Sequence, residues 1–64
     1  MQAKSAKKFG ARVYLHDDGV LEVSQTILRN GRYVIDAQST ERFVKPGDDR
    51  ALGEAVRLAC EGKL

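Results

Sequence analysis

Apolar and polar residues alternate between Phe9 and His16, which is the pattern of a β-strand that buries one face. The same pattern recurs from Val20 to Leu28 and from Arg32 to Ala37, and residues 40–45 form a further short run after a polar turn. Hydrophobic patterning therefore predicts four successive strands. In the first of them the residues expected to face the core are Phe9, Ala11, Val13 and Leu15.

The loop between the first two strands sets how they pair. A two-residue turn at Asp18 and Gly19 would place the apolar residues of the two strands on opposite faces. A three-residue loop, residues 17–19, instead pairs Val13 with Val23 and keeps both in the core. We therefore predict the three-residue loop, with Gly19 in the left-handed conformation.

The second loop is interpreted in the same way. A three-residue loop at residues 29–31 pairs Ile27 with Tyr33. This register places Tyr33 and Ile35 in the core and turns Val34 toward solvent.

The orientation of the fourth strand depends on the length of the connection before it. An odd-length connection turns Phe43 toward the core, and an even one turns Val44 there. We predict Phe43 in the core, because a ring offers more apolar area to a small protein.

Residues 48–62 carry the helical pattern of the chain. Asp48 follows Pro46 and Gly47 and is suited to cap the helix, and Gly62 is suited to end it. Gly53 is unfavourable inside a helix, and either close approach to the sheet or a binding surface would explain it. The broad apolar side comprises Ala51, Leu52, Ala55, Val56, Leu58, Ala59 and Cys60.

These elements predict an α+β fold, an antiparallel four-stranded β-meander with one C-terminal helix packed on one face. Residues 9–64 form the single domain, and residues 1–8 are expected to be a disordered basic arm. Three of the eleven basic residues lie in that arm, so the domain carries eight basic against nine acidic residues. A near-neutral domain is weak evidence for a nucleic-acid ligand.

No apolar run is long enough to cross a bilayer and no signal peptide is evident, so we expect a soluble, cytoplasmic chain without a membrane partner. Cys60 has no second cysteine to pair with and is predicted to be a small core residue in a reducing compartment.

Residues capable of catalysis are sparse. His16 is the single histidine, and the acidic pairs at residues 17–18 and 48–49 lie where turns and caps favour Asp. The sequence has no metal-ligand spacing, no phosphate-binding loop and no paired catalytic carboxylates. We predict a non-enzyme without a cofactor or a metal.

The solvent face of the predicted sheet is the candidate binding surface. Its apolar members suggest a protein contact, whereas arginines beside a tyrosine are typical of single-stranded nucleic-acid binding, which the lysine-rich arm would assist. The candidate residues are Arg12, Tyr14, Leu28, Arg32, Val34 and Arg42.

The C-terminal third, from Ser39 to Cys60, resembles the end of bacterial contact-dependent growth inhibition immunity proteins. In that family a strand leads through an acidic cap into a helix that begins with a run like Leu52, Gly53, Glu54 and Ala55. The resemblance implies a cytoplasmic inhibitor that binds one cognate toxin. We therefore predict a small non-catalytic protein-binding module, with a single-stranded nucleic-acid-binding protein as the alternative.

A second copy of the chain is also an expected partner. One helix covers one face of a four-stranded sheet, and a chain of this length buries little apolar surface. An antiparallel sheet has two unpaired edges, and residues 40–44 contain no proline to block one of them. We predict a homodimer that pairs through an edge strand.

Overall fold

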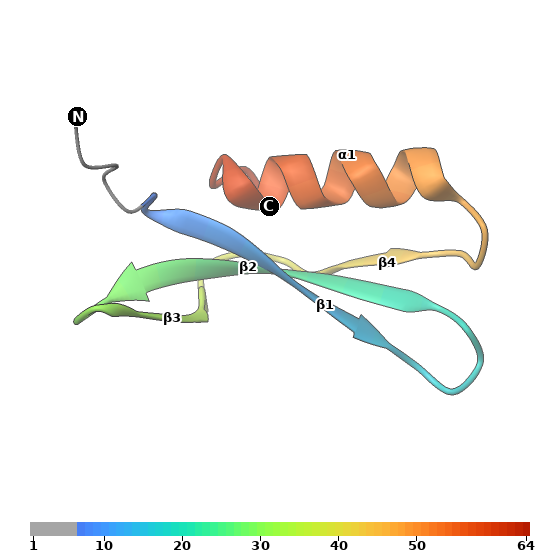
Figure 1. Ribbon diagram of the computed structural model, residues 1–64, viewed down its shortest axis with the longest axis horizontal. Helices are drawn as coiled ribbons and strands as arrows, with labels where there is room; N and C mark the ends of the chain where they lie inside the picture. Colours follow the sequence, from blue (N-terminus) through green and yellow to red (C-terminus); the bar gives the residue numbers. More distant parts are fainter. Residues whose placement is uncertain (1–6) are drawn as a thin grey trace, which may run out of the picture.

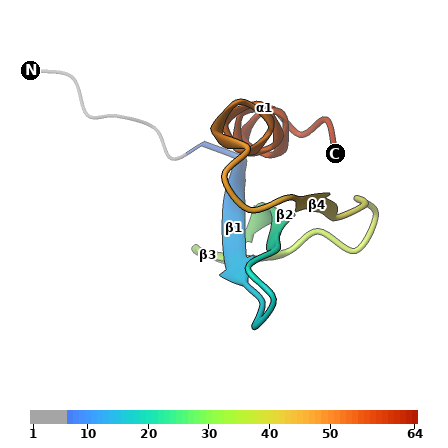
Figure 2. The same ribbon diagram turned by 90° about the vertical axis from the view of Figure 1, so that its right-hand side faces the viewer.

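The computed structural model describes residues 7–64, which form a sheet of four antiparallel strands with one helix packed on it. The predicted α+β fold is confirmed. Figures 1 and 2 show the helix lying on one side of the sheet. The elements are β1 (Phe9–Leu15), β2 (Leu21–Arg29), β3 (Arg32–Ile35), β4 (Arg42–Val44) and α1 (Asp49–Cys60).

The longest strand, β2, forms the centre of the sheet. It pairs with β1 along one edge, and along its other edge it pairs first with β4 and then with β3. The last strand of the predicted meander therefore returns to β2 and does not continue beyond β3. The reason is length: β3 has four residues and leaves the first half of β2 open, and β4 satisfies backbone groups there.

The first hairpin has the predicted register. Val13 lies opposite Val23 and Leu15 opposite Leu21. The backbone N–H of His16 donates to the carbonyl of Val20 at 2.9 Å, and Gly19 has a φ of 89°. The three-residue loop is confirmed.

The second hairpin does not have the predicted register. Asn30 (φ 52°) and Gly31 (φ 80°) form a two-residue turn in which both residues have positive φ, as a type I′ turn requires. Leu28 consequently lies opposite Tyr33. A shift of one residue reverses the faces of a strand, so Tyr33 and Ile35 point away from the helix.

The fourth strand is also turned opposite to the prediction. Val44 lies opposite Leu21 and is 2% exposed, whereas Phe43 is 58% exposed. The helix presents the fully buried residues Ala55 and Ala59 to the sheet. Alanines bring a helix close to its neighbour, and the remaining space fits a valine better than a ring.

The core is small. Its buried apolar residues are Val23, Val44, Ala55 and Ala59, and Val23 is the one large side chain among residues 7–64 that is fully buried. The partly buried residues packed around them are Ala11, Leu21, Ala51, Leu52, Val56 and Leu64. This core is modest for a free-standing domain.

Gln25 is a buried polar residue that joins three parts of the chain. Its Nε2 donates to Asp36 Oδ2 at 2.7 Å, and its Oε1 accepts from the backbone N–H of Leu64 at 2.9 Å. The backbone N–H of Asp36 also donates to the Gln25 carbonyl. The side chain therefore ties the β3–β4 connection and the segment after α1 to the central strand.

Both helix caps follow the prediction. Asp48 Oδ1 accepts from the backbone N–H of Ala51 at 3.1 Å. After Cys60, the N–H of Gly62 donates to Ala59 and that of Lys63 to Leu58, which is the Schellman arrangement. Cys60 itself is exposed, so its predicted place in the core is wrong.

Gly53 lies on the exposed side of α1, and no atom approaches within 4 Å of the position that a Cβ would occupy. Close approach to the sheet therefore does not explain this glycine. Gly53→Ala is expected to raise the free energy of unfolding by about 0.5–1 kcal/mol, because alanine removes backbone freedom from the unfolded chain. Urea unfolding of the two proteins measures this change, and equal or lower stability of the variant would contradict it.

Residues 1–6, and with them most of the predicted disordered arm, lie outside the described residues. Lys7 and Lys8 have exposed side chains, and their carbonyl oxygens accept hydrogen bonds from the Tyr33 hydroxyl and the Leu28 N–H. Within residues 7–64, no helix combines the length and the apolar composition that crossing a membrane requires.

Candidate interaction face

The sheet face opposite α1 has no covering element among the described residues, and we call it the outer face. Its members follow from strand alternation, because Val23 and Val44 point to the helix and their neighbours therefore point away. They are Gly10, Arg12, Tyr14 and His16 from the first strand and hairpin, Glu22, Ser24, Thr26 and Leu28 from β2, Tyr33 and Ile35 from β3, and Phe43 from β4.

The structure divides the residues expected on this face. Arg12, Tyr14 and Leu28 lie on it. Arg32 and Val34 lie on the helix side of β3, because the second hairpin is shifted by one residue.

Arg42 also belongs to the helix side. It lies opposite Val23, and its Nη1 is 3.8 Å from Glu54 Oε1 of α1. Of the three arginines proposed for the outer face, Arg12 alone lies there, so the face carries less positive charge than expected.

Sequence reasoning missed Tyr33, Ile35 and Phe43 as surface residues. All three point away from the helix and are 46–58% exposed. For Tyr33 and Ile35 the Asn30–Gly31 dipeptide was the available signal, because this pair is the strongest short-range indicator of a two-residue hairpin turn.

Aromatic rings meet at the hairpin end of the outer face. The Tyr14 and His16 rings pack edge to face with their centroids 4.9 Å apart, and the His16 and Phe43 centroids are 6.1 Å apart. His16 Nε2 is 2.8 Å from Glu22 Oε1, which fixes the imidazole between the two rings. The cluster thus joins side chains of the first hairpin to a side chain of β4, which is distant from that hairpin in the sequence.

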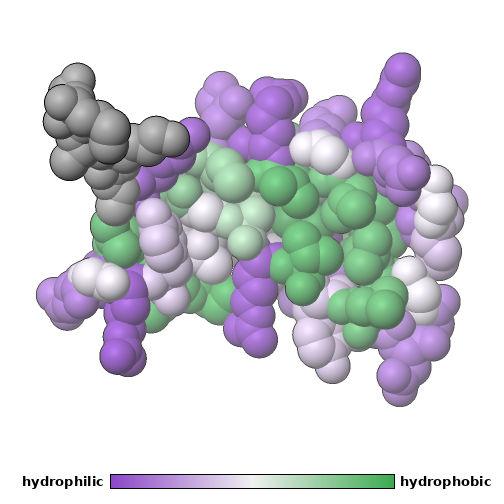
Figure 3. All heavy atoms as spheres, in the orientation of Figure 1, coloured by the Kyte–Doolittle hydropathy of each residue, from purple (hydrophilic) through white to green (hydrophobic). Residues whose placement is uncertain are grey.

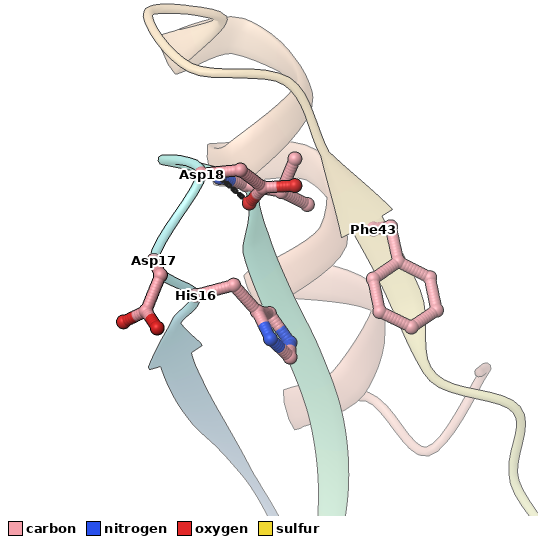
Figure 4. Close-up of a pocket in the computed structure, with 5 residues that line it drawn as sticks. His16, Asp17, Asp18 and Phe43 are labelled. Atoms are coloured by element: carbon pink, nitrogen blue, oxygen red, sulfur yellow. Dashed lines mark hydrogen bonds between the residues drawn. The ribbon is translucent and has the colours of Figure 1, made fainter.

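A hollow lies between this cluster and the first loop. Figure 4 shows the His16 and Phe43 rings facing each other across it, while Asp17 points away. Asp18 Oδ1 accepts from the N–H of Val20 at 3.0 Å, so that carboxylate is used in the turn. A hollow between two aromatic rings, with the Asp18 carboxylate already hydrogen-bonded, suits an apolar side chain of a ligand.

A second hollow extends along the sheet and mixes charges. Arg12 lies in it with Glu22 and Glu41, so one basic side chain stands beside two acidic ones. Its lining residues are Arg12, Tyr14, His16, Glu22, Ser24, Ile35 and Glu41.

The far end of the outer face is rigid because Tyr33 covers Gly10. A Cβ on Gly10 would lie 2.8 Å from Thr26 Oγ1 and 3.7 Å from the Tyr33 ring. The hydroxyl of Tyr33 donates to the Lys7 carbonyl. The ring is therefore held at both ends, over the backbone of β1.

Groups suited to covalent or metal chemistry do not gather on this face. His16 is engaged with Glu22, and Cys60 lies on the helix. Among residues 7–64, no group of three His, Cys, Asp or Glu side chains is placed to hold a metal ion. The arrangement is suited to recognition through rings and hydrogen bonds.

Comparisons with protein-family models, with curated proteins and with solved structures find no match to this chain. The resemblance carried by Leu52 to Ala55 therefore stays a prediction, and the functional argument rests on the geometry of the outer face.

Proposed function

We propose that the chain is a small, non-catalytic protein-binding module that recognises its partner with the outer face. The observation that carries the proposal is the exposure of Tyr14, Tyr33, Ile35 and Phe43, at 46–58% each, on the side of the sheet that no element of residues 7–64 covers. Large exposed apolar patches on small proteins mark interaction sites, and aromatic residues with arginine dominate the energetics of protein interfaces.

Hydrogen bonds that hold two rings of the outer face, those of His16 and Tyr33, support the proposal. His16 is fixed by Glu22, and Tyr33 is fixed by the Lys7 carbonyl. A surface whose rings are already ordered loses less entropy when it binds.

The charges on the outer face favour a protein over a polyanion. Arg12 lies beside Glu22 and Glu41 in the same hollow, and carboxylates repel phosphates. A mixed surface of this kind is complementary to the mixed charges of another protein.

Single-stranded nucleic acid is the second candidate, and one observation favours it. The register places the Tyr14, Tyr33 and Phe43 rings on the same sheet face as Arg12. Bases stack on rings exposed in this way, and arginine can contact their phosphates.

A more specific form of the proposal follows from the resemblance to immunity proteins. In that form the partner is a toxin, the chain inhibits it by binding, and both act in the cytoplasm. A homodimer that pairs through an edge strand completes the proposal.

Capture from a native lysate, with and without nuclease, distinguishes the two candidates. We expect the tagged protein to retain one protein after nuclease treatment. The double variant Tyr14→Ser, Phe43→Ser should lose it, and Arg50→Ser on the exposed side of α1 should retain it. Nuclease-sensitive retention, or binding of single-stranded oligonucleotides that falls steeply with salt, would favour the second candidate.

A further inference from the structure

The outer edge of β1 has free backbone groups. Leu28 N–H donates to the Lys8 carbonyl and His16 N–H to the Val20 carbonyl, so even-numbered residues of β1 bond with β2. Antiparallel pairs alternate, and the N–H and C=O groups of Ala11, Val13 and Leu15 therefore point away from β2. No strand of the described chain pairs with that edge.

Nothing in the sequence of β1 blocks this edge. The strand is seven residues long, contains no proline and has one charged residue, Arg12. Natural edge strands that stay unpaired are usually short or are protected by lysine, proline or a bulge. The opposite edge of the sheet is formed by two shorter strands, β3 and β4.

An apolar surface accompanies the free edge on the helix side of the sheet. Ala11 packs against the core, but Val13 and Leu15, on the same side of the strand, are 46% and 64% exposed. Leu52 and Val56 of α1 are only partly buried. Figure 3 shows apolar side chains gathered between the helix and the β1–β2 hairpin.

One register of β1 paired with itself brings compatible side chains together. With Val13 on the twofold axis, Val13 meets Val13 of the partner subunit and Ala11 meets Leu15 of the partner subunit. Arg12 then lies opposite Tyr14 of the partner subunit, where a cation and a ring attract each other. Moving the axis to Arg12 would set two arginines against each other, which is unfavourable.

We propose that two copies of this chain pair antiparallel along β1, with Val13 on the twofold axis, to form one continuous sheet. The occupant is a second copy because the edge is complementary to itself, as a twofold interface requires. The small core supplies the second reason, since small domains gain from association the burial that one chain lacks.

The dimer would bring the two helices onto the same side of the joined sheet. A twofold axis perpendicular to a sheet keeps equivalent faces together, so Val13 and Leu15 of both copies become covered between the helices. The two outer faces stay open on the other side. The pairing therefore leaves Tyr33, Ile35 and Phe43 accessible to a binding partner, and only Arg12 and Tyr14 of the outer face lie at the seam between the two copies.

Sedimentation equilibrium and NMR on the full chain test the pairing. We expect a mass rising from 7.1 kDa toward twice that value with concentration. Val13→Lys and, separately, Leu15→Lys should raise the dimer dissociation constant more than about tenfold, because each places a charge inside the interface. Ile35→Ser on the outer face should leave the constant unchanged, and circular dichroism checks that each variant is folded.

The register has its own readout. The amide of Val13 should become protected from hydrogen exchange as the dimer forms, and mixed-label samples should show a contact between the Hα atoms of Arg12 and Tyr14 across the interface. A folded monomer at all concentrations would overturn the proposal. So would a dimer that Ile35→Ser disrupts and Val13→Lys does not, because its contact would lie on the outer face.

Discussion

Gln25→Glu is expected to lower the free energy of unfolding by about 3 kcal/mol at neutral pH, the largest loss from any single change considered. The side chain of Gln25 is 3% exposed, and its Nε2 donates to Asp36 Oδ2 at 2.7 Å. Glutamate keeps the shape and the acceptor for Leu64 N–H, but it removes the donor and sets two carboxylates against each other. Urea unfolding measures the loss.

A second substitution supplies the control for Gln25→Glu. In the double variant Gln25→Glu, Asp36→Asn the donor and the acceptor are exchanged, and we expect most of the lost stability to return. The single variant should also recover at acidic pH, where a protonated carboxyl at position 25 can donate. A loss that neither condition reverses would show that the hydrogen bond to Asp36 is not what holds the connection before β4.

Gly62→Ala is expected to cost about 2 kcal/mol of unfolding free energy. Gly62 has a φ of 75°, a conformation that side chains disfavour. An added Cβ would also lie within 3 Å of three atoms of the Phe9 ring, so the ring would have to move from the end of the helix. Thermal and urea unfolding measure the effect.

Gly47→Ala is the matched control for this change. Gly47 has a φ of 80°, but no atom lies within 4 Å of its Cβ position. The two variants share the backbone strain, and only Gly62→Ala adds the contact with Phe9. If both variants lose the same stability, the packing of Phe9 on the helix end contributes nothing measurable.

The features that the sequence predicted correctly are governed by local chemistry. Asp48 and Gly62 delimit the helix because they satisfy its terminal backbone groups. The first hairpin follows from Gly19 and from the need to keep Val13 and Val23 on one face. In each case the residues that decide the structure are close together in the sequence or are paired by a short loop.

The prediction failed where two local signals competed or where the partner was distant. At Asn30 and Gly31, the preference of these residues for positive φ determined the turn, although it moves Tyr33 and Ile35 into solvent. The face of Phe43 depends on β4 pairing with β2, which no pattern within residues 40–45 specifies.

Gln25 shows a further limit of patterning. The alternation of β2 marks it as an interruption of the core, yet the structure buries it with both its amide nitrogen and its amide oxygen hydrogen-bonded. Its partners lie 11 and 39 residues away in the chain, so no local motif indicates them.

The turn at Asn30 and Gly31, together with the pairing of β4, determines which residues form the candidate site. Tyr33 and Ile35 join Tyr14 on the outer face because β3 is shifted by one residue, and Phe43 joins them because β4 pairs with β2. Arg32 and Arg42 leave the face for the same reasons. A surface predicted to combine three arginines with one tyrosine instead carries one of those arginines and several aromatic rings, which is the basis for proposing a protein partner.

Site-specific photo-crosslinking in living cells tests that proposal most directly. A photoreactive phenylalanine analogue at Phe43, on the outer face, should yield an adduct of one defined mass with a different protein. The same group at Glu61, an exposed residue after the helix, should yield none of it. An adduct with nucleic acid, an adduct of twice the chain's own mass, or equal crosslinking from both positions would contradict the assignment of the outer face to a protein partner.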